Sequence, residues 1–127
     1  GIPTIVWISP LLPYINDTEE NLRGILDYCF DAGVIGIVCF GIGTTMRDGS
    51  REHFYSQLDK ILPGLKRVYA RKYGHSYECL SDSNDALMKI FHEECQKHKV
   101  MHRVDQIFDY INKYESKAEE NEQLSLF

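Results

Sequence analysis

Two short runs of apolar residues near the amino end of the chain are separated by an amphipathic segment. The runs, residues 5–8 and 34–40, are rich in β-branched side chains, which is typical of strands covered on both faces in a parallel sheet. The segment between them predicts a helix that Asp17 caps and Gly33 ends. Gly24 within this helix costs about 1 kcal/mol relative to alanine, which indicates close packing on a strand. The three segments together predict a right-handed βαβ unit.

The remaining apolar positions predict further helices and a third short strand. A helix with apolar residues at 54, 58, 61 and 62 ends at Pro63-Gly64, and others are expected at Leu65–Tyr73, at 83–98 and at 104–114. The strand is expected at 77–80. Strands that alternate with helices are typical of an α/β layer structure, either an open sheet or part of a (β/α) barrel. We therefore expect residues 1–114 to contain about three parallel strands with flanking helices.

The end of the chain differs in composition from the rest. Residues 115–122 contain four glutamates, one lysine and no large apolar side chain, so residues 115–127 predict a mobile acidic tail. The whole chain of 127 residues has a net charge of −5, and the part before this tail is close to neutral. Bulk charge therefore gives no argument for nucleic-acid binding.

The expected compartment follows from what the sequence lacks. No apolar run approaches the roughly 18 residues of a membrane span, and no signal segment opens the chain. The four cysteines lie in apolar settings without a CxxC spacing, which predicts reduced core thiols: Cys29, Cys39, Cys79 and Cys95. We expect a cytoplasmic protein with no membrane partner. Because Gly1 is not a methionine and leads almost at once into a strand, we also expect a fragment of a longer protein.

In either architecture, ligands bind where the strands end at their carboxyl side. This rule places residues 9–13 and 41–47 at the functional rim. Gly41-Ile42-Gly43 lacks the third glycine of a dinucleotide-binding motif, because Met46 stands at that position. Two interpretations stay open. Either the glycines let the backbone approach a ligand while Arg47 binds an anionic group, or the segment is a tight turn with a surface arginine.

Histidine and cysteine side chains recur in the helix expected at 83–98 and just after it. His92, Cys95, His98 and His102 fall within an arc of about 120° on an ideal helix, so a zinc site is conceivable. Their spacing matches no familiar zinc pattern, and Cys95 continues an apolar stripe. We favour a core cysteine with partly buried histidines, and we expect no metal site.

A basic segment at residues 60–73 contains five lysines or arginines and no acid. Its arginines and the adjacent tyrosines would suit phosphate groups, whereas a solvated helix face explains the same pattern without a ligand. We favour the solvated face. No arrangement of nucleophile and base can be assigned from spacing, since such residues meet only in space.

Three longer stretches resemble one enzyme family. They are ISPLLPYINDTEENL at residues 8–22, FGIGTTMRDGSREHFY at 40–55, and PGLKRVY at 63–69 with the residues that follow to Gly74. Across residues 4–114 the chain resembles the carboxyl-terminal part of radical S-adenosylmethionine (SAM) enzymes, in the spore-photoproduct-lyase-like branch often labelled DNA repair photolyase. The resemblance implies a bacterial protein with a partial (β/α)₆ barrel, whose early strands precede Gly1.

In this family a [4Fe–4S] cluster held by a CxxxCxxC motif cleaves SAM reductively, and the resulting 5′-deoxyadenosyl radical abstracts hydrogen from the substrate. The four cysteines of this chain do not have that spacing. The resemblance therefore implies that cluster and SAM act in a full-length parent, and that this chain alone binds neither. We expect no catalytic residue in this chain and no activity from it alone. The resemblance does not identify the substrate of the parent, and it leaves open whether the parent binds DNA.

The resemblance also assigns residues to the SAM pocket. One loop follows the family's fifth strand, and its backbone groups contact SAM. The other loop follows the sixth strand and lies near the adenine. The residues concerned are Ser9, Pro10 and Asn16 in the first loop, and Gly41, Gly43 and Thr44 in the second. In this interpretation the amino-terminal remainder of the barrel is a partner of the chain.

The last five residues, QLSLF, resemble the pentapeptide by which bacterial proteins dock on the replication sliding clamp. The resemblance implies that Gln123 lies at the edge of the clamp pocket and Leu124 in a small groove. Ser125 follows, and Leu126 with Phe127 would enter the deep apolar pocket. A polar, flexible segment that ends in a few apolar side chains suits reversible binding. The alternative is that the tail folds back onto the chain's own apolar surface.

The leading hypothesis is therefore the cofactor-distal part of a radical SAM enzyme, which its tail tethers to the sliding clamp. Two alternatives stay open. One is a noncatalytic α/β interaction module that the same tail recruits, and the other is a different barrel enzyme that binds a phosphate near Arg47.

Overall fold

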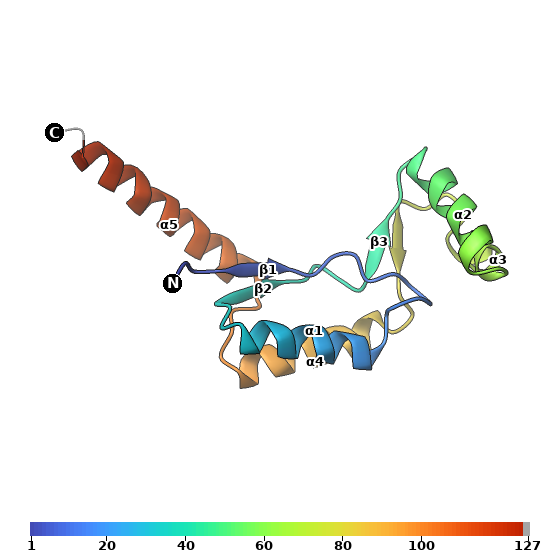
Figure 1. The fold of residues 1–127 in the computed structure, drawn as a ribbon, viewed down its shortest axis with the longest axis horizontal. Coiled ribbons are helices and arrows are strands. Elements are labelled where there is room, and N and C mark those ends of the chain that lie inside the picture. The colour runs from blue at the N-terminus through green and yellow to red at the C-terminus, as the bar shows by residue number, and fades with distance from the viewer. Residues whose placement is uncertain (126–127) are drawn as a thin grey trace.

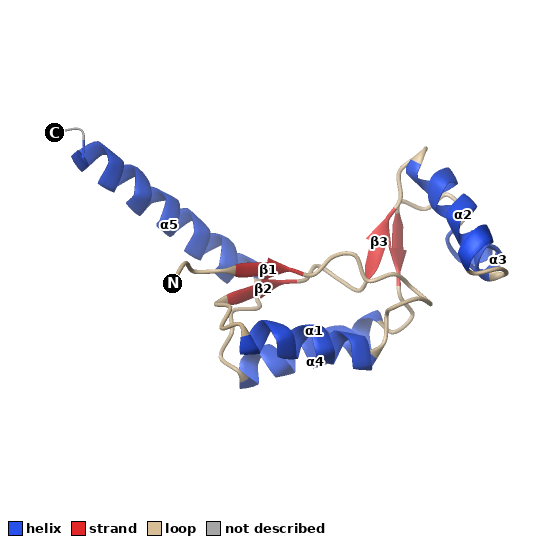
Figure 2. Ribbon diagram, viewed as in Figure 1, coloured by secondary structure: helices blue, strands red, loops and turns tan. Residues whose placement is uncertain are grey.

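The computed structural model describes residues 1–125, which form an α/β structure (Figures 1 and 2). β1 (Ile5–Trp7) leads through α1 (Glu19–Asp31) to β2 (Gly36–Val38). β1 and β2 pair in parallel, with Ile5 opposite Gly36. The α/β class and the amino-terminal strand–helix–strand order are therefore as the hydrophobic pattern predicts.

α1 begins at a cap one residue later than the sequence indicates. The hydroxyl of Thr18 accepts a hydrogen bond from the backbone N–H of Asn21 at 3.1 Å, which satisfies one of the free donors of the first turn. Asp17, the expected cap, instead accepts a hydrogen bond from the Ser81 hydroxyl. The helix ends just before Gly33, as expected, because glycine tolerates the φ of +72° found there.

α1 and α4 (Asn84–Lys97) lie side by side and cover one face of the β1–β2 sheet (Figure 1). Their apolar stripes meet the sheet in the larger of the two apolar cores. Full burial of one large apolar side chain in such a core contributes about 1.5–3 kcal/mol. The most deeply buried side chains of this core are Leu22, Leu26, Ile37, Ile42, Phe91 and Cys95.

Part of the opposite face of this sheet is open. α5 (Val104–Ser125) covers it at the beginning of the helix, where Ile107 is buried next to Gly36. Trp7 lies on the same face as Gly36, because both belong to the same set of alternating positions. Trp7 is 60% exposed, so the expectation that β1 is covered on both faces is wrong for the described residues.

Two further strands form a second small sheet, and two helices lie between these strands along the chain. β3 (Gly43–Thr45) is followed by α2 (Ser50–Ile61), α3 (Leu65–Tyr73) and β4 (Glu78–Leu80). β3 and β4 pair in antiparallel orientation. The apolar core beneath them is formed by Met46, Leu58, Tyr69, Tyr73 and Cys79.

The strand expected at 77–80 is therefore present, but the expectation that it joins a parallel sheet is wrong. The described residues form two two-stranded sheets rather than a barrel. The far edge of β2 is occupied: the N–H of Ile37 donates to the carbonyl of Met101 at 2.8 Å, and the N–H of Met101 donates to the carbonyl of Ile35 at 3.0 Å. β4 does not pair at that edge but pairs with β3.

α5 is longer than the sequence pattern predicts. The helix expected to end near residue 114 continues to Ser125, so the expected end of this helix is wrong. Residues 115–123 consist mostly of glutamate, lysine, alanine and glutamine and contain no glycine or proline. This high helix propensity outweighs the low apolar content. Leu126 and Phe127 of the proposed docking motif lie outside the described residues.

Figure 1 shows α5 running away from both sheets. The helix has 22 residues and carries charged side chains along its length. Within residues 1–125, no helix combines the length and the apolar character that crossing a membrane requires.

Gly43 is required where β3 approaches β4. A Cβ atom at this position would lie 2.4 Å from the carbonyl oxygen of Cys79 and 2.9 Å from the Cα atom of Leu80. Both are backbone atoms, so the two strands would have to separate. We expect Gly43→Ala to lower the free energy of unfolding by about 1–3 kcal/mol, measured by urea denaturation.

Gly24→Ala is the matched control. No heavy atom lies within 4 Å of a Cβ atom at Gly24 on the exposed side of α1, so the expected close packing of Gly24 on a strand is wrong. Alanine has the higher helix propensity, and Gly24→Ala should raise the free energy of unfolding by about 0.5–1 kcal/mol. Equal effects of the two substitutions would contradict the role assigned to Gly43.

Candidate functional site at the strand ends

A shallow pocket of about 210 Å³ lies where β1 and β2 end at their carboxyl side, and the β3–β4 sheet forms its wall. Ser9 follows β1 and Gly41 follows β2. Parallel pairing brings these distant positions to the same edge. Four of the six residues that the sequence assigns to a cofactor pocket line this one together: Ser9, Gly41, Gly43 and Thr44.

Pro10 and Asn16 are not among the lining residues. Pro10 is exposed in the loop that follows β1. The side-chain oxygen of Asn16 accepts a hydrogen bond from the N–H of Leu12, and its carbonyl accepts one from the side chain of Asn21 at 2.9 Å. Asn16 therefore holds the loop between β1 and α1 in shape, and it supports the pocket only through that loop.

The loop between β2 and β3 is fixed by its neighbours. The N–H of Ile42 donates to the side-chain oxygen of Asn84 at 2.8 Å, and the carbonyl of Ile42 accepts a hydrogen bond from the N–H of Ser81 at 2.8 Å. Gly43 fits against the backbone of β4, so its missing Cβ serves the contact between the strands and not the approach of a ligand. The pocket is therefore preformed, as ligand pockets usually are.

Two aromatic side chains at the pocket are not among the residues that the sequence singles out. Trp7 and Phe40 are each 60% exposed, and their ring centroids lie 5.3 Å apart. Aromatic rings attract one another at this separation, so the pair forms one apolar edge of the pocket. A tryptophan inside an apolar run predicts a core residue, and the exposure of Trp7 depends on the open sheet face.

Glu78 is the one charged side chain among the lining residues, and Ser9, Thr44 and Thr45 add hydroxyl groups. The lining thus offers aromatic rings, hydrogen-bonding groups and one negative charge. Charge complementarity favours a neutral or cationic ligand over a phosphorylated one.

Arg47, the candidate anion-binding residue, does not line the pocket. It is exposed beyond the end of β3, and its hydrogen bond to the phenol of Tyr77 lowers the pKa of that phenol. The buried arginine of this region is Arg51, which is 4% exposed.

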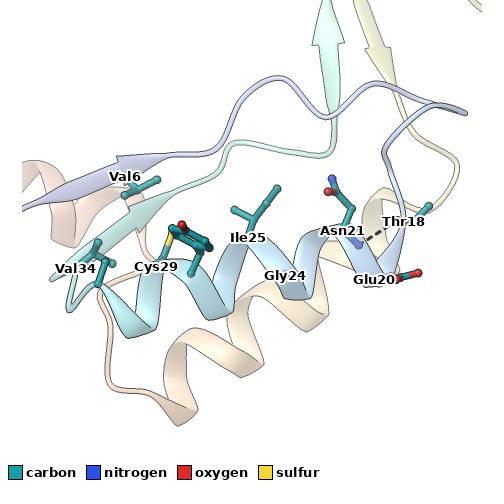
Figure 3. Close-up of a pocket in the computed structure, with 10 residues that line it drawn as sticks. Val6, Thr18, Glu20, Asn21, Gly24, Ile25, Cys29 and Val34 are labelled. Carbon is teal, nitrogen blue, oxygen red and sulfur yellow. Dashed lines mark hydrogen bonds between the residues drawn. The ribbon is translucent and has the colours of Figure 1, made fainter.

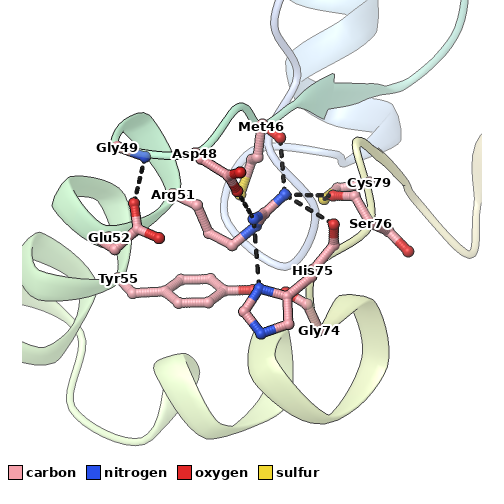
Figure 4. Close-up of polar contacts among 10 residues, drawn as sticks. All are labelled: Met46, Asp48, Gly49, Arg51, Glu52, Tyr55, Gly74, His75, Ser76 and Cys79. Carbon is pink, nitrogen blue, oxygen red and sulfur yellow. Dashed lines mark hydrogen bonds and ion pairs between the residues drawn. The ribbon is translucent and has the colours of Figure 1, made fainter.

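Arg51 joins the two ends of the α2–α3 segment (Figure 4). Its guanidinium donates to the carbonyls of Met46 and His75 at 2.9 Å each and to that of Ser76 at 3.2 Å. It also forms an ion pair with Asp48 at 2.8 Å. Sequence reasoning misses this residue because an arginine in an amphipathic helix is normally solvated, and two of its carbonyl partners, His75 and Ser76, lie far along the chain.

The four residues considered as metal ligands do not converge. Cys95 is fully buried, as favoured from its apolar stripe, and burial raises the pKa of its thiol to about 12. His98 stacks on Phe30 with ring centroids 3.9 Å apart. His92 and His102 do meet, with their Nδ1 atoms 2.7 Å apart. Among the residues that the structure describes, no group of three or more histidine, cysteine or acidic side chains is placed to hold a metal ion.

The tyrosines of the basic segment belong to the smaller core. Tyr69 is fully buried and donates a hydrogen bond to the carbonyl of Pro13, and Tyr73 donates one to the carbonyl of Leu80. Neither ring is free to stack on a base. The arrangement favours a solvated helix face over a nucleic-acid surface on α3.

A larger apolar groove of about 790 Å³ lies along α1, beside β1. Figure 3 shows Val6 and Ile25 directed into the space between helix and strand. Tyr28, also in the lining, is 82% exposed. The groove offers mostly apolar surface, so it suits a packing element better than a small polar ligand.

Comparison of the chain with protein-family models, with curated proteins and with solved structures gives no match. The function must therefore be argued from the residues of the strand-end pocket and from the sequence.

Proposed function

We propose that this chain is the cofactor-distal part of a bacterial radical SAM enzyme of the spore-photoproduct-lyase-like kind, and that its strand-end pocket receives the adenosine end of SAM. The observation that carries the proposal is the meeting of Ser9, Gly41, Gly43 and Thr44 in one pocket. The resemblance assigns these residues to SAM, and the pairing of β1 with β2 independently brings the two loops together.

The lining suits SAM in charge and in its apolar surface. SAM carries a positive sulfonium and no phosphate, and the charged group of the lining is the carboxylate of Glu78. The exposed rings of Trp7 and Phe40 offer an apolar surface for the adenine. SAM bound there would supply hydrogen-abstraction chemistry once the cluster of the parent provides the electron that cleaves it, while the residues of this chain would bind and orient its nucleoside.

The cysteines of this chain do not fit the iron–sulfur cluster. All four are free and buried, and burial raises the pKa of each thiol, whereas clusters are held by thiolates. In the proposal the cluster belongs to another part of the parent, and this chain alone does not catalyse the reaction.

The free edge of β1 is where the remainder of the proposed barrel would join. The N–H of Ile8 donates to the carbonyl of Val38 at 2.9 Å. Because backbone groups alternate along a strand, those of Ile5 and Trp7 point to the opposite edge, which pairs with no strand among residues 1–125. A preceding parallel strand would pair there, and its helix would fill the groove beside α1.

The second part of the proposal is that QLSLF docks on the replication sliding clamp. α5 continues as a helix through Gln123 and Leu124 to Ser125, and a helix end costs little to unwind. The motif can therefore extend into the clamp pocket. Burial of Leu126 and Phe127 would contribute roughly 3–5 kcal/mol before ordering costs.

The alternative functions make different predictions. A noncatalytic interaction module would keep clamp docking, but its upstream sequence would carry no cluster motif. A barrel enzyme that binds a phosphate near Arg47 is less favoured, because that side chain hydrogen-bonds Tyr77 outside the pocket.

The coding sequence directly upstream of Gly1 tests the enzyme proposal. We expect CxxxCxxC there, and the longer protein purified without oxygen should contain about four iron atoms per chain. Alanine substitutions in that motif should remove the iron, whereas Cys29→Ala in this chain should leave it in place. An upstream region without the motif would refute the enzyme proposal and favour the interaction module.

Titration of a bacterial sliding clamp with the full chain tests the docking proposal. Because two apolar anchors are lost, a Leu126→Ala, Phe127→Ala double variant should bind at least about tenfold more weakly than wild type. Glu119→Ala, outside the motif, is the matched control and should bind like wild type. Equal binding by all three proteins, or no binding by wild type, would contradict docking.

A further inference from the structure

Two histidines, one on α4 and one just before α5, have no role in the proposed function. His92 lies on α4, and His102 lies between Met101, which bridges to β2, and the first residue of α5, Val104. Both histidines are partly buried, and their Nδ1 atoms are 2.7 Å apart. Two elements fixed by different contacts thus bring these rings together.

The rings are arranged for a hydrogen bond rather than for a metal ion. The ring centroids lie 4.9 Å apart. This separation is close to the distance between the two Nδ1 atoms plus, for each ring, the distance from its centroid to its own Nδ1. Each Nδ1 therefore points at the other. A chelated metal would require both nitrogens to point at a third position, at about 2.0–2.1 Å from each.

The protonation states of the pair decide whether this contact exists. A hydrogen bond between two Nδ1 atoms needs one donor and one acceptor. It forms when both rings are neutral, and it becomes charge-assisted when one ring gains a proton. When both rings are protonated, two N–H groups face each other and the charges repel. The contact thus tolerates one added proton but not two.

The surroundings oppose the second proton. Burial lowers the pKa of His102 most, followed by the charges of His92 and Arg103. Arg103 is itself paired with Asp105 at 3.0 Å. The ring of Phe91 lies beside both histidines, with centroids 5.0 Å and 6.4 Å away, and it keeps water from part of the pair.

We propose that His92 and His102 form a proton-sensitive latch, which fixes the beginning of α5 to α4 and opens when both rings are protonated. The same region is also held by the Met101 bridge to β2 and by the burial of Ile107. Because these contacts remain when the latch opens, only the start of α5 loosens, and the core between α1 and α4 stays folded.

The latch gives α5 a means of regulation. α5 carries the terminal motif, so the latch sets how firmly the start of this helix is anchored to the body of the protein. This link to docking rests on the proposed function, whereas the latch itself does not. Failure of clamp binding and failure of the latch are measured separately.

The direction of the pH dependence follows from the lowered pKa. When the latch opens, the pKa of His102 returns toward its ordinary value of 6.5. The open state then binds more protons than the closed state, so lowering the pH favours opening. The free-energy difference that favours the closed state is greatest above pH 6.5 and decreases as the pH falls below 6.5.

Hydrogen exchange of the full chain tests the latch. Protection factors of the amides at residues 107–111, corrected for intrinsic exchange, should fall at least about fivefold from about pH 7.5 to about pH 5.5, while those of α1 stay unchanged. His102→Gln and His92→Gln should remove this pH dependence, because glutamine does not titrate. His53→Gln, on the exposed side of α2, is the matched control and should retain it.

Protection that is independent of pH in wild type, or a pH dependence retained in His102→Gln, would overturn the proposal. If the variants do not fold, nitrogen NMR of the wild-type imidazoles decides. The last titration step of the pair should lie below 6.5, and a last step at or above that value would overturn the latch. Stoichiometric zinc that is lost in His92→Gln would also overturn it, because a metal would then replace the shared proton.

Discussion

The parallel pairing of β1 with β2 is the constraint on which the rest of the structure depends. Parallel strands cannot be joined by a tight turn, so a crossover is required, and α1 supplies it. Because the two strands run in the same direction, they end at the same edge. Ser9 and Gly41 meet there, and the apolar stripe of α1 is directed onto one face of the sheet. The pocket is thus a consequence of strand direction.

Met101 occupies the far edge of β2, and β4 pairs with β3 in a separate sheet that forms the wall of the strand-end pocket. The same bridge fixes the chain just before His102 and brings that ring to His92. One backbone contact therefore links the candidate binding site with the proposed latch on α5.

Features that depend on nearby residues could be predicted from the sequence. Apolar runs and a helical stripe identify β1, α1 and β2, and the rule for strand ends places at the rim five residues that line the pocket: Ser9, Gly41, Gly43, Thr44 and Thr45. Features that depend on distant residues could not. β4 pairs with the distant β3, the exposure of Trp7 depends on an open sheet face, and the burial of Arg51 depends in part on carbonyls beyond α3. In the tail, helix propensity and low apolar content oppose each other, and propensity prevails to Ser125.

The central claim is that the strand-end pocket receives the nucleoside of SAM. Backbone amide NMR of the longer protein with its cluster in place, titrated with SAM, measures this most directly because it reports the place of binding as well as its occurrence. The proposal predicts shift changes that cluster at Ser9, Gly41, Gly43 and Thr44. No change on addition of SAM, or changes confined to the groove along α1, would contradict it.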